Sequence, residues 1–266
     1  MILIDGSYGE GGGQIIRSAL TLSLLTGKPF RADRVRAGRE NPGLQNQHLM
    51  AINAAAKISD ADTAGTAKGS RQFTFRPGKV KPGTYEFRIG TAGSTGLVMQ
   101  TILLPLILGD TSSKITIEGG THNPWAPPFD FLERTFLPLI NQMGPVVTAV
   151  LHKYGFYPSG GGEVTFQITP ASTLAPLHLN EDDGVKAITA KVVLVNLPEH
   201  IAKREAEVLQ KSLPKIEHVD NKIEILQPTN CRGQGNFIAL HLKRASLVET
   251  FTAIGGKGIR AEEGAD

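Results

Sequence analysis

The chain carries one pattern of apolar and polar positions twice. Residues 6–27 read GSYGEGGGQIIRSALTLSLLTG, and residues 90–109 read GTAGSTGLVMQTILLPLILG. Each stretch leaves a short strand, passes through a glycine-rich turn and continues with the apolar residues of a helix. With one gap allowed, Arg17 aligns with Gln100. The pattern predicts a unit of strand, turn and helix in two copies.

The segments that follow each copy also match. AGRENP at 37–42 aligns with GGTHNP at 119–124, and FRPG at 75–78 aligns with FYPSG at 156–160. Each copy therefore predicts a β-α-β-α-β-β module that has a G-x-x-N-P loop before its second helix and closes with a β-hairpin. The period is roughly eighty residues. We predict an α/β fold of pseudo-symmetric repeated modules.

The two modules cover about residues 1–80 and 81–162, and a third begins with a further strand and is interrupted. We expect residues 1–183 to form a body of repeated modules that carries the catalytic residues. The strands and helix of residues 184–266 predict a small inserted α/β domain. The interrupted module has no completion within these residues, so we expect its completion to be absent from the chain.

Composition limits the classes of function. The chain has 266 residues, 40% of them hydrophobic, which is typical of a folded globular protein. Its net charge is only +3, so anion binding must come from local clusters of Lys and Arg. Cys231 is the single cysteine and excludes an intramolecular disulfide. The most apolar run, at 101–109, is too short to span a bilayer, and we predict a cytoplasmic protein.

The first glycine-rich turn has two interpretations. Unpaired N–H groups at a helix N-terminus attract anions, but Gly9, Gly11, Gly12 and Gly13 are also explained by a tight passage from strand to helix. The turn matches neither a Walker A motif nor a dinucleotide fingerprint. Glu10 favours a functional interpretation, because a carboxylate at such a turn needs a cation nearby. That cation is an arginine or a divalent Mg²⁺ or Mn²⁺ ion.

Arg17, Arg36 and Arg39 are the arginines available to this turn. Arg36 and Arg39 also suit a phosphate clamp, since guanidinium groups bind phosphate oxygens in pairs. The alternative is a surface salt bridge with Asp33 or Glu40. The second module keeps Gly and Asn-Pro in this loop but lacks the arginine, so the backbone does not require it. For His48 we favour a capping or packing role.

The corresponding loop of the second module holds His122, Trp125, Pro127 and Pro128. These residues suit a stacking wall for a nucleobase, and they suit a buried structural turn equally well. Gln100 is a polar residue on an otherwise apolar helix. It is either an ordinary polar position or a contact to a nucleotide.

DGSYGEGGGQIIRSALTLS, RAGRENPGLQNQH, GSTGLVMQT, NPWAPPFDFLERTFLPL and YGFYPSGGGEV together resemble the RNA 3′-terminal phosphate cyclases. The resemblance implies an architecture like that of the enolpyruvyl transferases, with an inserted domain. It implies a cytoplasmic enzyme of the ligase class that acts on RNA 3′-phosphate ends. ATP would adenylylate a histidine of the enzyme, the AMP would pass to the RNA 3′-phosphate, and the 2′-OH would displace it to leave a 2′,3′-cyclic phosphate.

The resemblance also implies roles for individual residues. Glu10 would bind Mg²⁺ or Mn²⁺. Gln100 would contact ATP, and Pro127 would contact its adenine. The residues that bind the phosphates and take part in catalysis would be Arg17, Arg36, Arg39 and Gln47. The family's nucleophilic histidine falls in a segment beyond residue 266. We therefore expect that these 266 residues alone do not self-adenylylate.

Two other functions remain open. One is a non-catalytic, cyclase-like role in RNA processing or ribosome assembly, which would not need the full cluster of phosphate-binding residues. The other is enolpyruvyl transfer, which rests on architecture alone, and architecture does not carry function.

Overall fold

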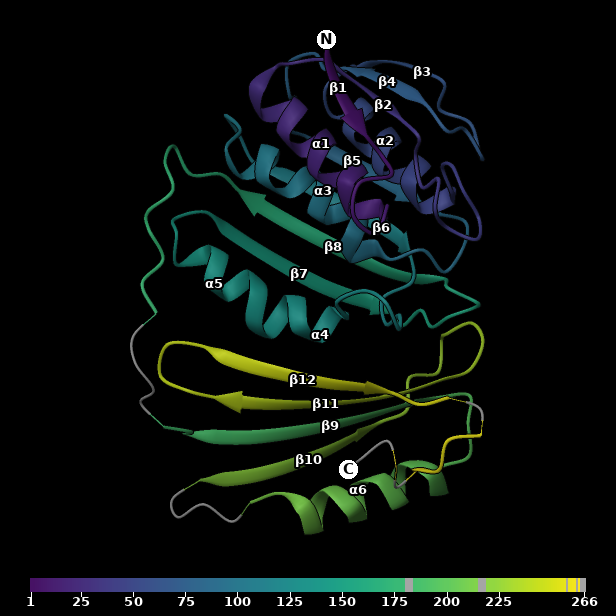
Figure 1. Ribbon diagram of the computed structural model, residues 1–266. Coiled ribbons are helices and arrows are strands. Elements are labelled where there is room, and N and C mark those ends of the chain that lie inside the picture. The colour runs from purple at the N-terminus through teal and green to yellow at the C-terminus, as the bar shows by residue number, and fades with distance from the viewer. Residues whose placement is uncertain (180–183, 215–218, 257, 262, 264–266) are drawn as a thin grey trace.

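The computed structural model contains three four-stranded β-sheets that alternate with layers of helices from the N-terminal end of the molecule downward (Figure 1). It describes residues 1–179, 184–214, 219–256, 258–261 and 263. This mixture of sheets and helices confirms the predicted α/β class.

The first sheet has the strand order β1-β2-β4-β3. β1 and β2 are parallel, and β4 runs antiparallel to both of its neighbours. Helix α1 connects the two parallel strands and ends at Gly27, whose φ of 67° is the left-handed conformation typical of a helix end. The elements are β1 (Ile2–Asp5), α1 (Gly13–Thr26), β2 (Phe30–Asp33), α2 (Asn46–Lys57), β3 (Asp62–Ala64) and β4 (Phe73–Arg76).

The second sheet repeats this topology with the order β5-β6-β8-β7. β5 and β6 are parallel, and β8 is antiparallel to both neighbours. The predicted duplication of a β-α-β-α-β-β module is therefore confirmed. The elements are β5 (Thr84–Arg88), α3 (Thr95–Ile107), β6 (Ser113–Gly119), α4 (Phe129–Phe131), a π-helical turn η1 (Leu132–Phe136), α5 (Leu137–Asn141), β7 (Val146–Lys153) and β8 (Gly162–Thr169).

The third sheet has the order β10-β9-β11-β12. β9 and β10 are parallel and are joined by α6, which covers the outer face of this sheet (Figure 1). The division of the chain into a body and an inserted domain at residue 184 stays a prediction. The elements are β9 (Ala187–Val195), α6 (His200–Ser212), β10 (Asp220–Leu226), β11 (Gly235–Lys243) and β12 (Val248–Ile254).

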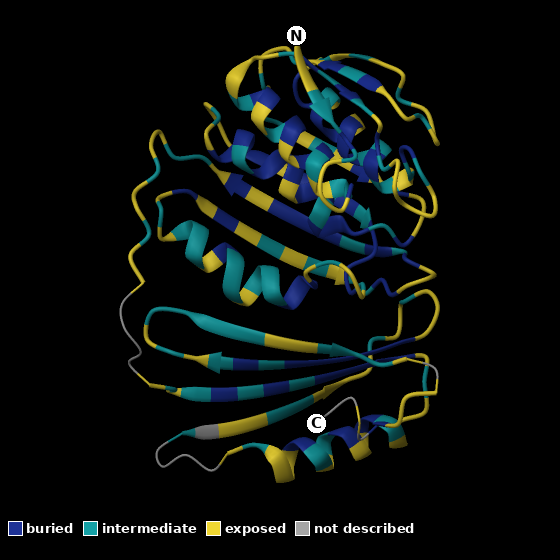
Figure 2. Cartoon of the chain, viewed as in Figure 1, coloured by how far each residue is buried: buried dark blue, intermediate teal, exposed yellow. Residues whose placement is uncertain are grey.

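One hydrophobic core joins the first two modules (Figure 2). Its fully buried members include Phe30 and Phe75 from the first sheet, Ile52 from α2 and Ile102 from α3. The helices α1, α2 and α3 pack on one another between the two sheets. As a result, the glycine-rich turns at the starts of α1 and α3 belong to one helical layer.

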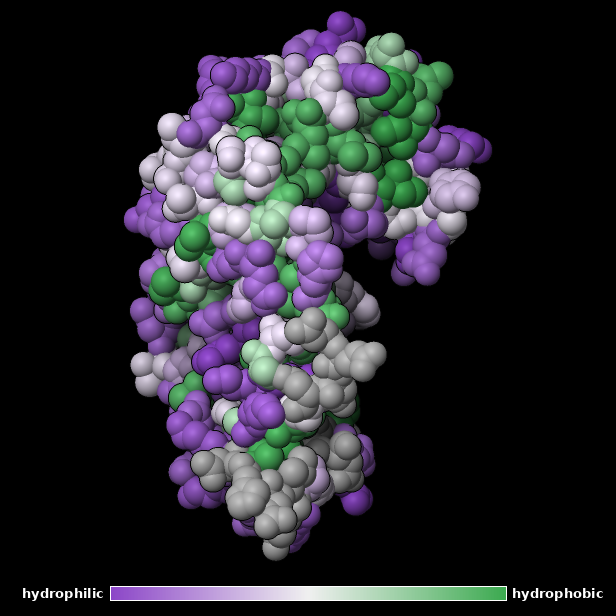
Figure 3. All heavy atoms as spheres, turned by 90° about the vertical axis from the view of Figure 1, so that its left-hand side faces the viewer, coloured by the Kyte–Doolittle hydropathy of each residue, from purple (hydrophilic) through white to green (hydrophobic). Residues whose placement is uncertain are grey.

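Apolar side chains are not all buried. Leu3 on the edge strand β1 is 72% exposed and Leu22 on α1 is 59% exposed. Figure 3 views the molecule from the left-hand side of Figure 1 and shows apolar side chains gathered on the upper half of that face. Among the residues that the structure describes, no helix is both long and apolar enough to cross a membrane.

Candidate functional site

The turn before α1 leaves the start of that helix open. Gly9 and Gly11 have φ angles of 56° and 57°, which glycine adopts without strain. The N-cap is Gly12, and no side chain caps the first turn of α1. The first N–H groups of the helix are thus available to an anion. In the second module, the hydroxyl of Ser94 accepts a hydrogen bond from the N–H of Leu97 and caps α3.

Glu10 and Arg39 form an ion pair across this turn. Nη2 of Arg39 lies 3.1 Å from Oε2 of Glu10, and the Glu10 side chain is 90% exposed. A Cβ atom at Gly12 would lie 3.6 Å from the same Arg39 nitrogen, so the guanidinium sits over the helix start. The cation expected beside Glu10 is therefore present as Arg39.

Arg36 lies next to Arg39 in an unusual backbone conformation, with a φ of 53°. Its Nη2 donates to the carbonyl of Asn41 at 3.3 Å, and its buried Nε has no partner among the described residues. Burial, and then the charge of Arg39, lower the pKa of Arg36. Arg36 as a whole is partly buried, and an incoming anion could supply the partner that its buried Nε lacks.

Arg17 connects the two modules. Its Nε donates to Oε1 of Gln100 on α3 at 3.0 Å, and its Nη2 donates to Gln14 at 2.7 Å. Arg17 and Gln100 are equivalent positions of the sequence repeat, so this hydrogen bond joins α1 to α3 at matching positions of the two modules. They line a shallow groove of about 300 Å³.

His48 caps α2. Its Nδ1 accepts the backbone N–H of Gln45 at 3.0 Å, and the Gln45 side chain completes a capping box. Its Nε2 faces Gly13, where any Cβ atom would collide with it. Burial, and then the charges of Arg36 and Arg17, lower the pKa of His48 to about 4. The predicted capping role is confirmed, and the imidazole is neutral at pH 7.

The remaining expected residues lie around this cluster. Gln47, beside His48 on α2, reaches the second glycine-rich turn, because a Cβ atom at Gly93 would lie 3.4 Å from its Cβ. Pro127 is exposed near the start of α3, where its carbonyl lies 3.6 Å from a Cβ built at Gly96. No hydrogen bond joins Pro127 to the arginine cluster among the described residues.

His122 is not part of a stacking wall, since it is fully buried. Its Nε2 donates to Asp130 at 2.8 Å, and its Nδ1 accepts from the hydroxyl of Thr121 at 2.8 Å. Burial, and then the charge of Lys191, lower its pKa to about 3. The alternative of a buried structural turn therefore describes His122, and Pro128 is buried as well. Trp125 and Pro127 on the same loop are exposed.

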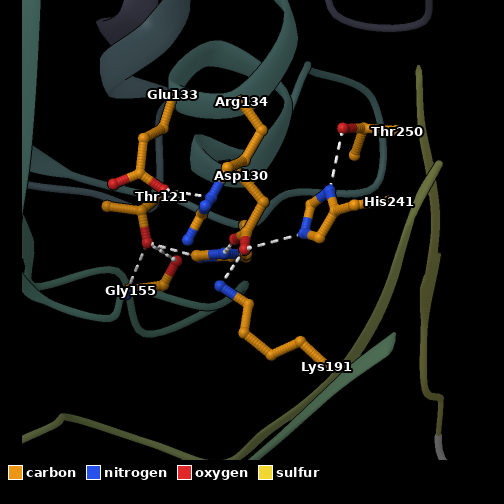
Figure 4. A network of polar contacts seen from close by, with 9 residues as sticks. Thr121, Asp130, Glu133, Arg134, Gly155, Lys191, His241 and Thr250 are labelled. Carbon is orange, nitrogen blue, oxygen red and sulfur yellow. Dashed lines mark hydrogen bonds and ion pairs between the residues drawn. The ribbon is translucent and has the colours of Figure 1, made fainter. Parts of the chain in front are cut away.

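The buried charge pair of Asp130 and Lys191 was not expected from the sequence (Figure 4). Asp130 on α4 is completely buried, and Lys191 comes from β9 of the third sheet. Burial lowers the pKa of Lys191 to about 8. His241 on β11 lies 3.9 Å from the same carboxylate and also contacts Thr250. Asp130 lies in the NPWAPPFDF stretch, but its partner is 61 residues away, beyond the reach of any local pattern.

The residues fit a divalent ion only in part. Among the described residues, no group of three or more His, Cys, Asp or Glu side chains is placed to hold a metal. Glu10 offers one exposed carboxylate beside the anion-binding helix start. Mg²⁺ commonly takes one or two carboxylates and completes its shell with phosphate oxygens and water, and Glu10 fits that donor set.

Comparison with known proteins identifies relatives along nearly the whole chain. The family model for RNA 3′-terminal phosphate cyclase matches residues 8–258. The RNA 3′-terminal phosphate cyclase of Koribacter versatilis (strain Ellin345) is 47% identical over 266 residues, which are 100% of this chain and 74% of the relative. That of Ectopseudomonas mendocina (strain ymp) is 47% identical over 265 residues, 100% of this chain and 76% of the relative. That of Salmonella agona (strain SL483) is 43% identical over 262 residues, which are 98% of this chain and 75% of the relative.

Proposed function

The chain belongs to the RNA 3′-terminal phosphate cyclase family, and we propose that it uses ATP to convert an RNA 3′-terminal phosphate to a 2′,3′-cyclic phosphate. The proposed route passes through enzyme-AMP and RNA-adenylate intermediates. The uncapped start of α1 beside Arg17, Arg36 and Arg39 is the observation that supports it best. Among the described residues, these three guanidinium groups have a single carboxylate partner, Glu10, and together they make a site for more than one phosphate group.

The activation step makes the terminal phosphate reactive. An oxygen of the RNA 3′-phosphate attacks the phosphorus of enzyme-bound AMP, the bond between enzyme and phosphorus breaks, and a phosphoanhydride forms. In the closing step the neighbouring 2′-oxygen attacks the RNA phosphorus, loses its proton to solvent, and expels AMP with the electron pair of the anhydride bond. The 2′-oxygen is already next to the phosphorus, so closure is intramolecular and fast.

In this proposal, the residues of the chain orient and neutralise the reacting phosphates. Arg36 and Arg39 hold the non-bridging oxygens, on which negative charge develops, and Arg17 acts from the side of α1. Gln47 and Gln100 position the two substrates, and Pro127 offers an apolar surface to adenine. Glu10 would hold a divalent ion, which supplies positive charge to the phosphate oxygens when bound.

Neither His48 nor His122 is assigned as the nucleophile. Both ring nitrogens of His122 are hydrogen bonded within the core. His48 uses Nδ1 to cap α2 and directs Nε2 against Gly13. Attack by either ring would require breaking these contacts.

The test is an assay of product formation. The purified product of the complete gene, and in parallel the 266 residues alone, are incubated with ATP, Mg²⁺ or Mn²⁺, and an RNA that carries a labelled 3′-phosphate. Cyclisation makes the label resistant to phosphatase, and intact-mass measurement of the acid-quenched and the neutral sample detects an acid-labile AMP adduct. An RNA with a 3′-hydroxyl end serves as the control.

We expect the product of the complete gene to give label protection that depends on ATP, and the 266 residues alone to carry no AMP adduct. Protection without ATP would contradict the adenylate route. RNA binding without an adduct or cyclic product would favour the alternative, a non-catalytic cyclase-like role in RNA processing or ribosome assembly.

A further inference from the structure

A second cleft lies where the two modules meet, beside the arginine cluster but separate from the Arg17 groove. It encloses about 360 Å³ and is here named the Trp125 cleft. The first module supplies the start of α2, with Gln45, Asn46 and Gln47, and also Lys68. The second module supplies the glycine-rich turn at 91–94, the loop at 123–126, and Tyr157 with Pro158.

Two exposed aromatic rings flank this cleft. The Trp125 side chain is 83% exposed and that of Tyr157 is 60% exposed. Their ring centroids lie 6.1 Å apart, with the ring planes at 77°. Neither ring is needed to fill the protein core, so a ligand can cover them without disturbing packing. A flat aromatic ligand lying on the indole would meet the tyrosine ring at its edge, a geometry that aromatic groups favour.

The polar groups of the cleft are available to a ligand. Asn46, Gln47 and Lys68 make no side-chain hydrogen bond or ion pair with a described residue. Amide groups can pair with the edge of a nucleobase, and an ammonium group can contact a backbone phosphate. The combination of stacking surface, amides and one positive charge is the chemistry that recognises unpaired nucleotides.

The cleft and the arginine cluster share the first turn of α2. Gln47 lines the cleft, while His48, the next residue, packs against Gly13 at the start of α1. Arg36 and Arg17 both act electrostatically on His48. A nucleotide whose base lies in the cleft can therefore direct a terminal phosphate toward the arginines.

We propose that the Trp125 cleft binds the base at the 3′ end of the RNA substrate by stacking on Trp125 and Tyr157. This inference rests on the proposed function, because it places one substrate of that reaction. The adenine of ATP is the other source of a nucleobase. The proposed function assigns adenine to Pro127, which does not line the cleft.

The chain provides its own probe, since Trp125 is its single tryptophan. Its fluorescence, excited at a wavelength that nucleotides do not absorb, reports on this cleft alone. The protein is titrated with a short RNA that ends in a 3′-phosphate, with the same RNA lacking the terminal base, with ATP alone and with inorganic phosphate. We expect strong quenching by the intact RNA and weak quenching by the other three.

Binding is measured separately by the anisotropy of RNA labelled at its 5′ end. Loss of a stacked base weakens binding several-fold to about a hundredfold in related systems, and we expect Trp125→Ala to weaken RNA binding about tenfold. Trp125→Phe keeps an aromatic surface and should stay within about threefold of wild type. Phe251→Ala, at an aromatic that is 56% exposed on β12, is the matched control and should bind RNA as wild type does.

The outcomes separate the two proposals. Suppose that the protein binds RNA, that Trp125→Ala binds RNA as well as wild type does, and that the RNA without its terminal base binds as well as the intact RNA. The cleft assignment is then wrong and the proposed function stands. If ATP alone quenches Trp125 and RNA does not, adenine occupies the cleft and the assignment to RNA is overturned. If neither RNA nor ATP binds by any method, the proposed function itself fails.

Discussion

The two G-x-x-N-P loops match each other in the sequence, but they differ in the structure in how far they are buried and in what they contact. The loop at 37–42 is largely exposed and carries Arg39, which pairs with Glu10. The loop at 119–124 buries Thr121 and His122, and His122 packs against Phe237 of the third sheet. A shared backbone frame therefore supports a candidate anion site in one module and an interface in the other.

Neighbouring structure explains the divergence. A Cβ atom at Gly120 would collide with the carbonyl of Ala92 and with the side chain of Asn123, whereas one at Gly38 would have open space around it. Ser94 caps α3, whereas α1 has no side-chain cap. In the second module, side chains of the module itself cap the helix and pack against the loop. In the first module, the N–H groups at the start of α1 stay available to a ligand. Four experiments test this difference, from the largest expected effect to the smallest.

Asp130→Asn should be the most destabilising change. It leaves the Lys191 ammonium buried without its charged partner, and loss of one partner of a buried pair costs about 3–5 kcal/mol. The free energy of unfolding is measured by denaturant titration. Asp110→Asn breaks an exposed ion pair with Lys79 and should cost less than about 0.5 kcal/mol. If both variants lost the same free energy of unfolding, the pair of Asp130 and Lys191 would not stabilise the contact between α4 and the third sheet.

Arg39→Ala should act on activity and leave stability nearly unchanged. Loss of a guanidinium from a phosphate site lowers kcat/KM by about a hundredfold, which corresponds to about 2.7 kcal/mol of transition-state stabilisation. Cyclic phosphate formation is the measurement. Arg88→Ala, at an exposed arginine on β5, is the control. Unchanged kcat/KM in Arg39→Ala would remove Arg39 from the site.

Gly120→Ala and Gly38→Ala compare equivalent positions directly. We expect Gly120→Ala to lower the free energy of unfolding by about 1–3 kcal/mol, because the new methyl group overpacks a closed loop. Gly38→Ala should change it by less than about 0.5 kcal/mol. A reversed order would mean that the first loop, and not the second, is the packed one.

His48 should make stability depend on pH. Its pKa is about 4 when folded and 6.5 when unfolded, so between these values the unfolded chain binds the extra proton. Stability therefore falls as pH drops below about 6.5, by about 1 kcal/mol at pH 5.5 for this group. His48→Gln keeps a residue suited to the capping box and does not titrate. Denaturant titrations at pH 7 and 5.5 should show a flatter dependence in that variant, and an unchanged slope would contradict the assignment.

Much of the fold could be predicted because its signals are local. Glycine turns, helical spacing of apolar residues and the two matching loops predicted the duplicated module. The capping role of His48 was likewise predictable, as its partner Gln45 is three residues away. The position of His122 was not, since exposure depends on the third sheet, whose strands begin at Ala187.

The sequence by itself determined the repeated module, the family and the set of arginines and glutamines that surround α1. Those features depend on residue type and spacing, which act over a few residues. Only the tertiary structure decided that Arg17 meets Gln100, that Asp130 meets Lys191, and that Trp125 and Tyr157 flank one cleft. Each of these contacts joins elements far apart in the chain, and packing of the helical layer and the three sheets determines which distant side chains meet.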